Sequence, residues 1–148
     1  MKKIMFAGIT TVALLAGCQS QQAANEEPVV INPTAQKVVY SGMLPCADCS
    51  GIRTTLTLYR DQFDAPTRFQ LREEYLQGSK VGLTTVERGD WSQDTRVQDE
   101  RQMELYTINP ETPDATRQYL RDAVNAVEQL DKNGELIKSN LNYRLLRK

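Results

Sequence analysis

The stretch Ile52-Arg53-Thr54-Thr55-Leu56-Thr57-Leu58-Tyr59 decides the fold, because its side chains alternate between two faces. One face carries Ile52, Thr54, Leu56 and Leu58, and the other carries Arg53, Thr55, Thr57 and Tyr59. A period of two predicts a half-buried β-strand. The same period recurs on both sides of this stretch, at 37–43, 68–75 and 103–107, with turn residues at 61–66 and 77–82.

The C-terminal third predicts a hairpin and a last strand. Residues 126–130 lead into Asn133-Gly134, a pair suited to a turn with positive φ at both central residues, and Leu136-Ile137 follows. A final strand is expected at 141–146. The polar stretch 93–101 and the proline-containing stretch 109–114 are expected to be loops. Residues 116–128 fit either a short amphipathic helix or two strands around a turn at 121–125, and the neighbouring strands favour the second.

Six to eight short strands with frequent turns predict an all-β fold, a small antiparallel barrel or sandwich. The interior of a barrel of this size is filled by side chains or holds one small ligand. Trp91, the only tryptophan, is expected in the core. The adjacent carboxylates Glu73-Glu74 and Asp99-Glu100 are expected to be solvated, since neighbours on a strand point to opposite faces and cannot share a proton.

Residues 1–17 have the features of a signal peptide. Lys2 and Lys3 precede a short apolar run, and Leu15-Ala16-Gly17 supplies small residues for cleavage. The run is too short for a membrane-spanning helix, which needs about 20 apolar residues. Leu15-Ala16-Gly17-Cys18 resembles a bacterial lipobox, which predicts diacylglycerol and an N-acyl chain on Cys18. Gln19 in the next position, where retained lipoproteins carry Asp, indicates delivery to the outer membrane by the lipoprotein sorting machinery.

Residues 18–36 are polar, contain Pro28 and Pro33, and are expected to be a flexible tether between the lipidated Cys18 and a folded domain at 37–148. Its end-to-end distance would average roughly 25 Å and reach about 60 Å when stretched. The domain would face the periplasm. Without Lys2 and Lys3 the 18 basic residues become 16 against 19 acidic ones, and no basic block exists, so a nucleic-acid partner is not expected.

The chain contains no histidine, which removes the usual general base and the commonest metal ligand. Ser41, Ser50 and Ser79 therefore have no activating partner of that kind, and we expect no enzymatic activity.

Cys46-Ala47-Asp48-Cys49 is the one stretch with distinctive chemistry. A disulfide is favoured in an oxidising compartment, although so short a loop would contribute only about 2 kcal/mol. The two thiolates also suit Cu(I), with Met43 as a third soft donor. Zinc fits less well for want of further ligands. A dithiol oxidoreductase would need a helix N-terminus, and strands flank this pair. Two unpaired, unreactive thiols are the remaining alternative.

The residues from Tyr40 to Ile52, which include Leu44-Pro45-Cys46-Ala47-Asp48-Cys49-Ser50-Gly51, resemble the signature of the NlpE family of bacterial outer-membrane lipoproteins. The resemblance extends from about 38 to 146. Further matching segments are Thr54-Thr55-Leu56-Thr57-Leu58, Glu74-Tyr75-Leu76, Gly89-Asp90-Trp91, Leu130-Asp131-Lys132-Asn133-Gly134-Glu135 and Asn142-Tyr143-Arg144-Leu145.

This resemblance implies a distorted, lipocalin-like antiparallel β-barrel. It also implies a role in copper tolerance, in surface sensing or in signalling envelope stress to an inner-membrane sensor kinase. Longer members carry a second, OB-like domain with another cysteine pair, and this sequence is expected to hold the first domain alone. The alternatives are a carrier of a small apolar ligand, with Cys46 and Cys49 merely structural, and an envelope protein that only docks to other proteins.

Overall fold

The computed structural model describes residues 36–148, with the side chain of Asp122 excepted. The expected signal peptide at 1–17 and all of the expected tether except residue 36 lie outside the described residues. The strands are β1 (Gln36–Leu44), β2 (Gly51–Arg60), β3 (Pro66–Gln77), β4 (Lys80–Gln98), β5 (Arg101–Ile108), β6 (Arg117–Ala123), β7 (Ala126–Gln129) and β8 (Arg144–Arg147). A single 3₁₀ turn, η1 (Pro113–Ala115), precedes β6.

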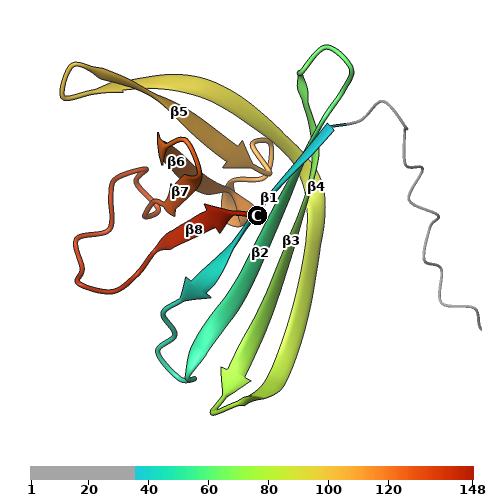
Figure 1. Ribbon diagram of the computed structural model, residues 1–148, viewed down its shortest axis with the longest axis vertical. Coiled ribbons are helices and arrows are strands. Elements are labelled where there is room, and N and C mark those ends of the chain that lie inside the picture. Colours follow the sequence, from blue (N-terminus) through green and yellow to red (C-terminus); the bar gives the residue numbers. More distant parts are fainter. Residues whose placement is uncertain (1–35) are drawn as a thin grey trace, which may run out of the picture. The chain divides into compact units, whose positions relative to one another are not determined.

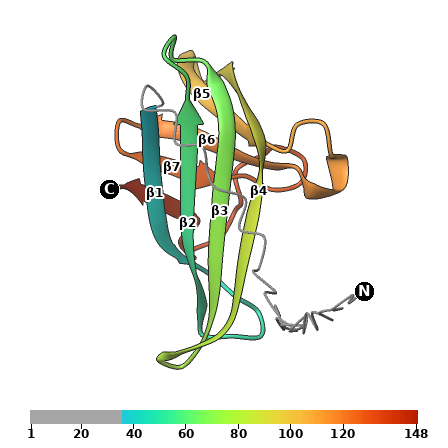
Figure 2. The same cartoon turned by 90° about the vertical axis from the view of Figure 1, so that its right-hand side faces the viewer.

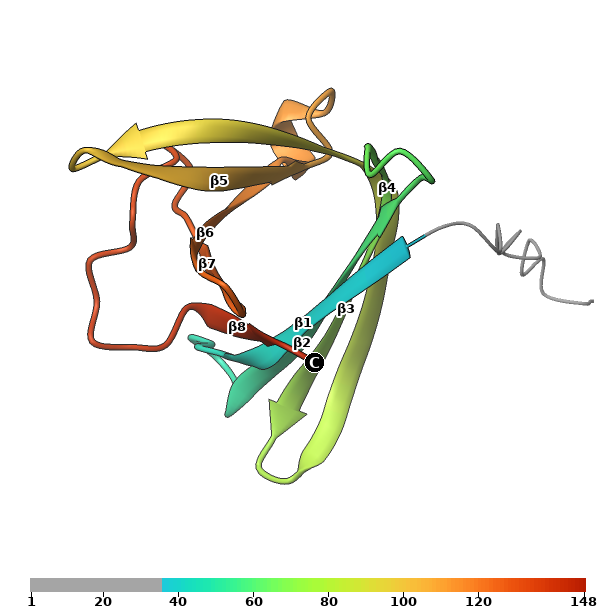
Figure 3. The ribbon, with the colours of Figure 1, turned by 45° about the horizontal axis from the view of Figure 1, so that its top comes forward.

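The eight strands form a closed barrel in sequence order, with every neighbouring pair antiparallel and β8 returning to β1 (Figure 1). The predicted all-β barrel is therefore confirmed. Strands β1 to β4 form a long wall, whereas β5 to β8 are shorter and cross it steeply (Figures 2 and 3).

Cross-strand rows explain why the alternation in β2 decides the fold. The row Tyr40, Leu56, Leu71 and Glu87 runs across β1 to β4, and directly opposite residues in a sheet point to the same face. Apolar side chains from all the inward rows meet inside the barrel. This core comprises Tyr40, Leu44, Leu56, Leu58, Phe69, Leu71, Trp91, Tyr106, Ile108, Tyr119, Val127 and Leu145. A core of this composition fills the interior, as expected for a barrel of this size.

The two ends of the barrel differ in their connections. At one end β1 begins and two turns connect β2 to β3 and β4 to β5; we call this the turn end. At the other end lie the loop 45–50 and the β3–β4 turn; we call this the Cys end. The loop 45–50 and the β3–β4 turn lie together at the bottom of Figures 1 and 2.

Several predicted boundaries are wrong. The expected loop at 93–101 is the end of β4 and the start of β5, joined at Asp99 and Glu100. Its polar composition reflects exposure to solvent, which does not prevent strand pairing. Residues 116–128 form strands, as favoured, but β6 continues to Ala123, so the turn is only 124–125.

The last hairpin is reduced to one bridge. Leu130 pairs with Leu136, and Gly134, but not Asn133, has a positive φ of 76°. Asp131 Oδ1 accepts hydrogen bonds from the backbone N–H groups of Asn133 (2.8 Å) and Glu135 (2.9 Å), so its side chain organises the turn. The final strand begins at Arg144 rather than 141.

Candidate functional site

The Cys46–Cys49 loop lies at the Cys end, between β1 and β2. The two sulfurs are bonded to each other at 2.07 Å, and the Cα atoms lie 5.3 Å apart. Both cysteines are half-buried, whereas Ala47 and Asp48 between them are exposed. The disulfide is therefore accessible from the loop side and partly protected on the barrel side.

Met43 and Cys49 both contact Gly51. A Cβ built on Gly51, whose φ is 151°, would lie 2.9 Å from Met43 Sδ, so a larger residue here would displace the methionine. Cys49 Sγ lies 3.4 Å from Gly51 O, a contact rather than a hydrogen bond because a disulfide sulfur carries no proton. Two of the three predicted soft donors, Met43 and Cys49, thus lie against one glycine, and Cys46 is bonded to Cys49.

Ser50 connects this loop to the β3–β4 turn. Its backbone N–H donates to Leu76 O at 2.8 Å, and its hydroxyl oxygen accepts from Gly78 N at 2.7 Å. These bonds fix the C-terminal side of the loop, so rearrangement on opening the disulfide would be confined mainly to residues 45–49. A shallow depression lies here, lined by Ala47, Asp48, Cys49, Ser50, Gln77 and Gly78.

The described residues offer no ready-made site for a hard or borderline metal ion. Among residues 36–148 no group of three or more His, Cys, Asp or Glu side chains is placed to hold one. A metal at the Cys end would depend on Cys46, Cys49 and Met43. Of the predicted site residues, the structure brings these three to one end of the barrel, while Cys18 lies outside the described residues.

A buried ion cluster at the Cys end was missed by the sequence analysis. Glu73 has a side chain only 7% exposed, which contradicts its expected solvation. Arg117, on β6, donates to its carboxylate at 2.8 and 3.4 Å and reaches Glu87 at 3.8 Å. Burial disfavours the charge of Arg117, but its bonds to Glu73 raise its pKa above the ordinary value. A desolvated carboxylate must be paired, and Arg117 supplies the opposite charge to Glu73. The two side chains together close this end of the core.

The other acidic residues that were expected to be solvated, Glu74, Asp99 and Glu100, differ in their exposure. Glu74 points outward, yet it is half-buried beneath two arginines, with bonds of 2.9 Å from Arg53 and 2.7 Å from Arg72. These hydrogen bonds lower the pKa of the Glu74 carboxyl. Asp99 and Glu100 are exposed in the β4–β5 turn, as expected.

At the turn end a different arginine closes the core. Trp91 is 3% exposed, which confirms its predicted place, and its indole N–H donates to Tyr59 O at 2.8 Å. The Arg60 guanidinium carbon lies 4.6 Å from the Trp91 ring centroid, a cation–π contact. Tyr106 meets the same ring edge-on at 5.2 Å.

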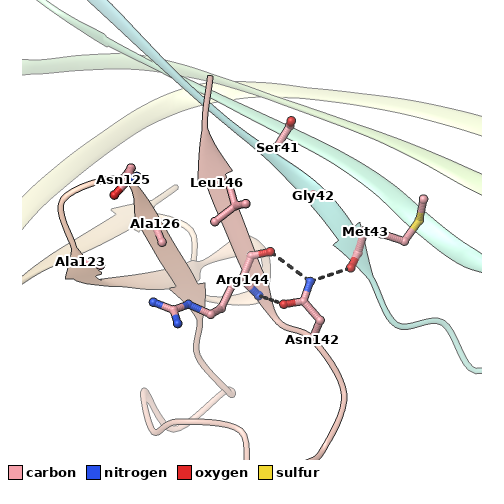
Figure 4. Close-up of a pocket in the computed structure, with 9 residues that line it drawn as sticks. All are labelled: Ser41, Gly42, Met43, Ala123, Asn125, Ala126, Asn142, Arg144 and Leu146. Carbon is pink, nitrogen blue, oxygen red and sulfur yellow. Dashed lines mark hydrogen bonds between the residues drawn. The ribbon is translucent and has the colours of Figure 1, made fainter.

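The junction between β1 and β8 is short and opens into a surface pocket of about 500 Å³ (Figure 4). Only Tyr40 and Ser41 pair with β8. Beyond them, the Asn142 side chain replaces the backbone hydrogen bonds that a further strand pair would make. Its Nδ2 donates to Met43 O (3.0 Å) and Arg144 O (3.2 Å), and its Oδ1 accepts from Arg144 N (3.2 Å). Gly42 permits this approach, since a Cβ there would lie 2.7 Å from Arg144 O.

The geometry defines a class of protein: a small antiparallel β-barrel with a filled interior and a disulfide-closed loop at one end. Comparison with known families is more specific. The model of the family described as NlpE N-terminal domain matches residues 40–140, and the chain belongs to that family.

A curated relative agrees with this assignment. The chain is 27% identical to the Lipoprotein NlpE of Escherichia coli (strain K12) over 151 aligned positions, which cover 98% of this chain and 57% of the relative. The chain thus spans little more than half the length of that relative. A solved structure, the crystal structure of the Cpx pathway activator NlpE from Escherichia coli, matches with a TM-score of 0.47 at 27% identity, over 72% of this chain and 48% of that one. Among the described residues, no helix has the length and apolarity needed to cross a membrane.

Proposed function

We propose that this chain is an outer-membrane lipoprotein, anchored through Cys18, that acts in copper tolerance or envelope-stress signalling through a redox- or Cu(I)-responsive Cys46–Cys49 pair. The placement of Met43, Cys46 and Cys49 around one exposed end of the barrel carries the proposal. Family membership supports the lipoprotein assignment. The proposal assigns no catalysed reaction to the chain.

The chemistry begins with the disulfide, whose sulfurs cannot act as thiolate ligands while bonded to each other. A dithiol reductant would transfer two electrons and two protons, giving two Cys thiols and the oxidised reductant. Cu(I) would then displace the thiol protons and bind the two thiolates, with the Met43 thioether as a neutral third donor. Ser50 would hold the barrel side of the loop in place.

Copper binding is tested by Cu(I) titration of the reduced chain under anaerobic conditions, in competition with a chromophoric chelator. We expect one Cu(I) per chain, and loss of that site in the Cys46→Ser, Cys49→Ser double variant. Met43→Leu should weaken binding by about tenfold if one soft ligand is lost. Equal affinity in the wild type and the double variant would exclude a metal role for the pair.

The anchor is tested separately. Intact-mass measurement should show acylation on Cys18, and the protein should fractionate with the outer membrane. Cys18→Ser should abolish both without changing the fold of residues 37–148. Acylated protein found in the inner membrane would overturn the sorting expected from Gln19.

Signalling is tested with a transcriptional reporter of envelope stress in a host that carries an intact sensor kinase. We expect overproduction of the wild-type chain to activate the reporter only when the kinase is present. Direct contact would be measured by capture of the kinase periplasmic domain on the purified full chain. Activation in a kinase-deleted host would contradict the proposed partner.

The alternative, carriage of a small apolar ligand in the barrel, has less support. Tyr40, Phe69, Tyr106 and Tyr119 are among the large side chains that fill the interior, each 2% exposed or less. A ligand would have to displace them.

A further inference from the structure

The outer face of the wall formed by β1 to β4 is basic, although the domain is acidic elsewhere. Figure 2 shows these four strands side by side, with β5 to β8 behind them. The charged residues that alternation places on this outer face are Lys37, Arg53, Arg68, Arg72, Arg88, Glu74 and Asp90, a net charge of +3. The other residues of 36–148 include 11 basic and 15 acidic ones, a net charge of −4. Positive charge is therefore concentrated on one side of the barrel.

The arginines of this face are held in place without being neutralised. Arg53 and Arg72 share the single carboxylate of Glu74, at 2.9 and 2.7 Å, so the three side chains together keep one net positive charge. The two arginine side chains remain 53% and 48% exposed. Arg88 donates to the neutral Gln70 side chain at 3.2 Å and keeps its own charge. Because these side chains are already ordered, a ligand that binds them loses less conformational entropy.

The same face continues into the pocket between β1 and β8. Ser41 pairs with Leu146 on β8 and with Thr55 on β2, and Thr55 pairs with Arg72 on β3. Directly opposite residues point to one face of a sheet, so this row runs along the outer surface from β8 to β3. Ser41 and Leu146 line the pocket of about 500 Å³, together with Met43 (Figure 4). The pocket and the arginines therefore open on one continuous surface.

The margin of the pocket is apolar. Leu146 is 59% exposed and Met43 is 43% exposed. Val124, which lies between the lining residues Ala123 and Asn125, is 75% exposed. Single exposed apolar side chains are ordinary, whereas several around one pocket are typical of an interaction site. The pocket is thus suited to an apolar side chain of a ligand.

We propose that this surface binds an acidic segment of another protein, with an apolar side chain of that segment in the pocket and its carboxylates against the arginines. A basic face on an otherwise acidic domain attracts an acidic partner and orients it. Arginine also pairs with carboxylates through two parallel hydrogen bonds. The proposal requires neither the lipid anchor nor a metal at Cys46 and Cys49, so it stands or falls independently of the proposed function.

The geometry of the sheet sets the spacing of the two contacts. Neighbouring strands are about 4.8 Å apart, so three strand spacings place Arg72 roughly 14 Å from Leu146. An extended segment advances about 3.3 Å per residue, so its acidic residues should lie about four positions from its apolar residue.

The test uses a library of random dodecapeptides displayed on phage and selected against the purified full chain. The triple variant Arg53→Gln, Arg72→Gln, Arg88→Gln removes the charge of the face. Its matched control, Arg101→Gln, Lys132→Gln, Lys138→Gln, removes the same charge from exposed residues elsewhere. Leu146→Asp alters the pocket, and Val97→Asp is its control at a side chain that is 66% exposed on β4, outside the pocket. Unchanged Trp91 emission and urea unfolding show that each variant is folded.

We expect the selected peptides to be acidic, with an apolar residue about four positions from the acids. The tightest peptide, made synthetically, should bind the triple variant and Leu146→Asp about tenfold more weakly than the wild type, and both controls equally well. Its affinity for the wild type should fall as salt is added.

Selected peptides without an acidic bias, or equal affinity for the triple variant and its control, would overturn the proposal. An anionic membrane is the competing occupant of a basic face. Flotation of the Cys18→Ser chain with phosphatidylglycerol vesicles, if the three arginine substitutions abolished it, would assign the face to lipid and refute the protein partner.

Discussion

An arginine closes each end of this barrel, but the two arginines do so by different interactions. At the turn end Arg60 lies over the face of Trp91 and hydrogen-bonds to Asp64 O and Gln93. At the Cys end Arg117 binds a buried carboxylate, Glu73, from the opposite wall. A ring face tolerates loss of its cation, whereas a buried carboxylate does not tolerate loss of its partner. The Cys end should therefore be the more sensitive to mutation.

The largest effect should follow removal of the Cys-end arginine. Arg117→Leu leaves the Glu73 carboxylate buried without its cation, and we expect a loss of about 3 kcal/mol in the free energy of unfolding. Urea unfolding followed by circular dichroism measures it. The matched control is Arg53→Leu, which breaks the outer pair to Glu74 from a side chain that is 53% exposed. That change should cost less than about 1 kcal/mol. Equal losses in the free energy of unfolding would show that the buried pair of Arg117 and Glu73 contributes no more than the exposed pair of Arg53 and Glu74.

The next largest effect should come from the disulfide. Cys46→Ser, Cys49→Ser removes the cross-link of a very short loop and should cost about 2 kcal/mol by the chain-entropy estimate. A reductant should lower the free energy of unfolding of the wild type by a similar amount, measured by urea unfolding, and leave the stability of the double variant unchanged. A larger loss in the variant than in the reduced wild type would mean that the serines disturb the loop.

A smaller effect is expected at the turn end. Arg60→Leu removes the cation–π contact and two hydrogen bonds, and should cost about 1 kcal/mol. The Trp91 emission spectrum should change in this variant and remain unchanged in folded Arg117→Leu, because only Arg60 contacts the indole ring among these two arginines. A greater loss of stability for Arg60→Leu than for Arg117→Leu would reverse the proposed ranking of the ends.

The smallest effect concerns pH. Burial opposes ionisation of Glu104, but hydrogen bonds from Arg121 and Tyr106 outweigh it and hold the Glu104 pKa below its ordinary 4.5. A lowered folded-state pKa stabilises the protein above the unfolded value, and that contribution is lost as pH falls through the folded value. Glu104→Gln should therefore reduce stability at pH 7 and flatten its decline below pH 4.5. Unfolding midpoints between pH 3 and 7 measure this. Parallel curves for the two proteins would contradict it.

The sequence predicted what depends on local alternation. The period of two in Ile52–Tyr59 predicted the barrel, and the spacing of Cys46 and Cys49 identified the loop that the structure closes with a disulfide. It could not predict the pairing of Glu73 with Arg117, because these residues are distant in sequence and meet only when the closed barrel brings the Arg117 side chain on β6 to the Glu73 carboxylate on β3.

Two other differences have the same origin. The polar residues 93–98 and Arg101 form strands because the partner strand supplies hydrogen bonds whatever the side chains are. Residues 141–143 do not extend β8 because the Asn142 amide replaces a backbone rung, which is a tertiary contact with Met43. Alternation predicts which face of its strand a side chain occupies, but it does not predict which distant strand that side chain will contact.

The short β1–β8 junction has a consequence for folding kinetics. Its pairs, Tyr40 with Arg147 and Ser41 with Leu146, join segments from opposite ends of the described chain, and such contacts close the longest loop. The junction should form last, and amide hydrogens there should exchange before those of β2 and β3. While it is open, β1 and β8 are free sheet edges, and free edges recruit other chains. The Asn142 amide, which bonds to both Met43 O and Arg144 O, helps to hold the junction closed and should thereby shorten the time for which these edges are free.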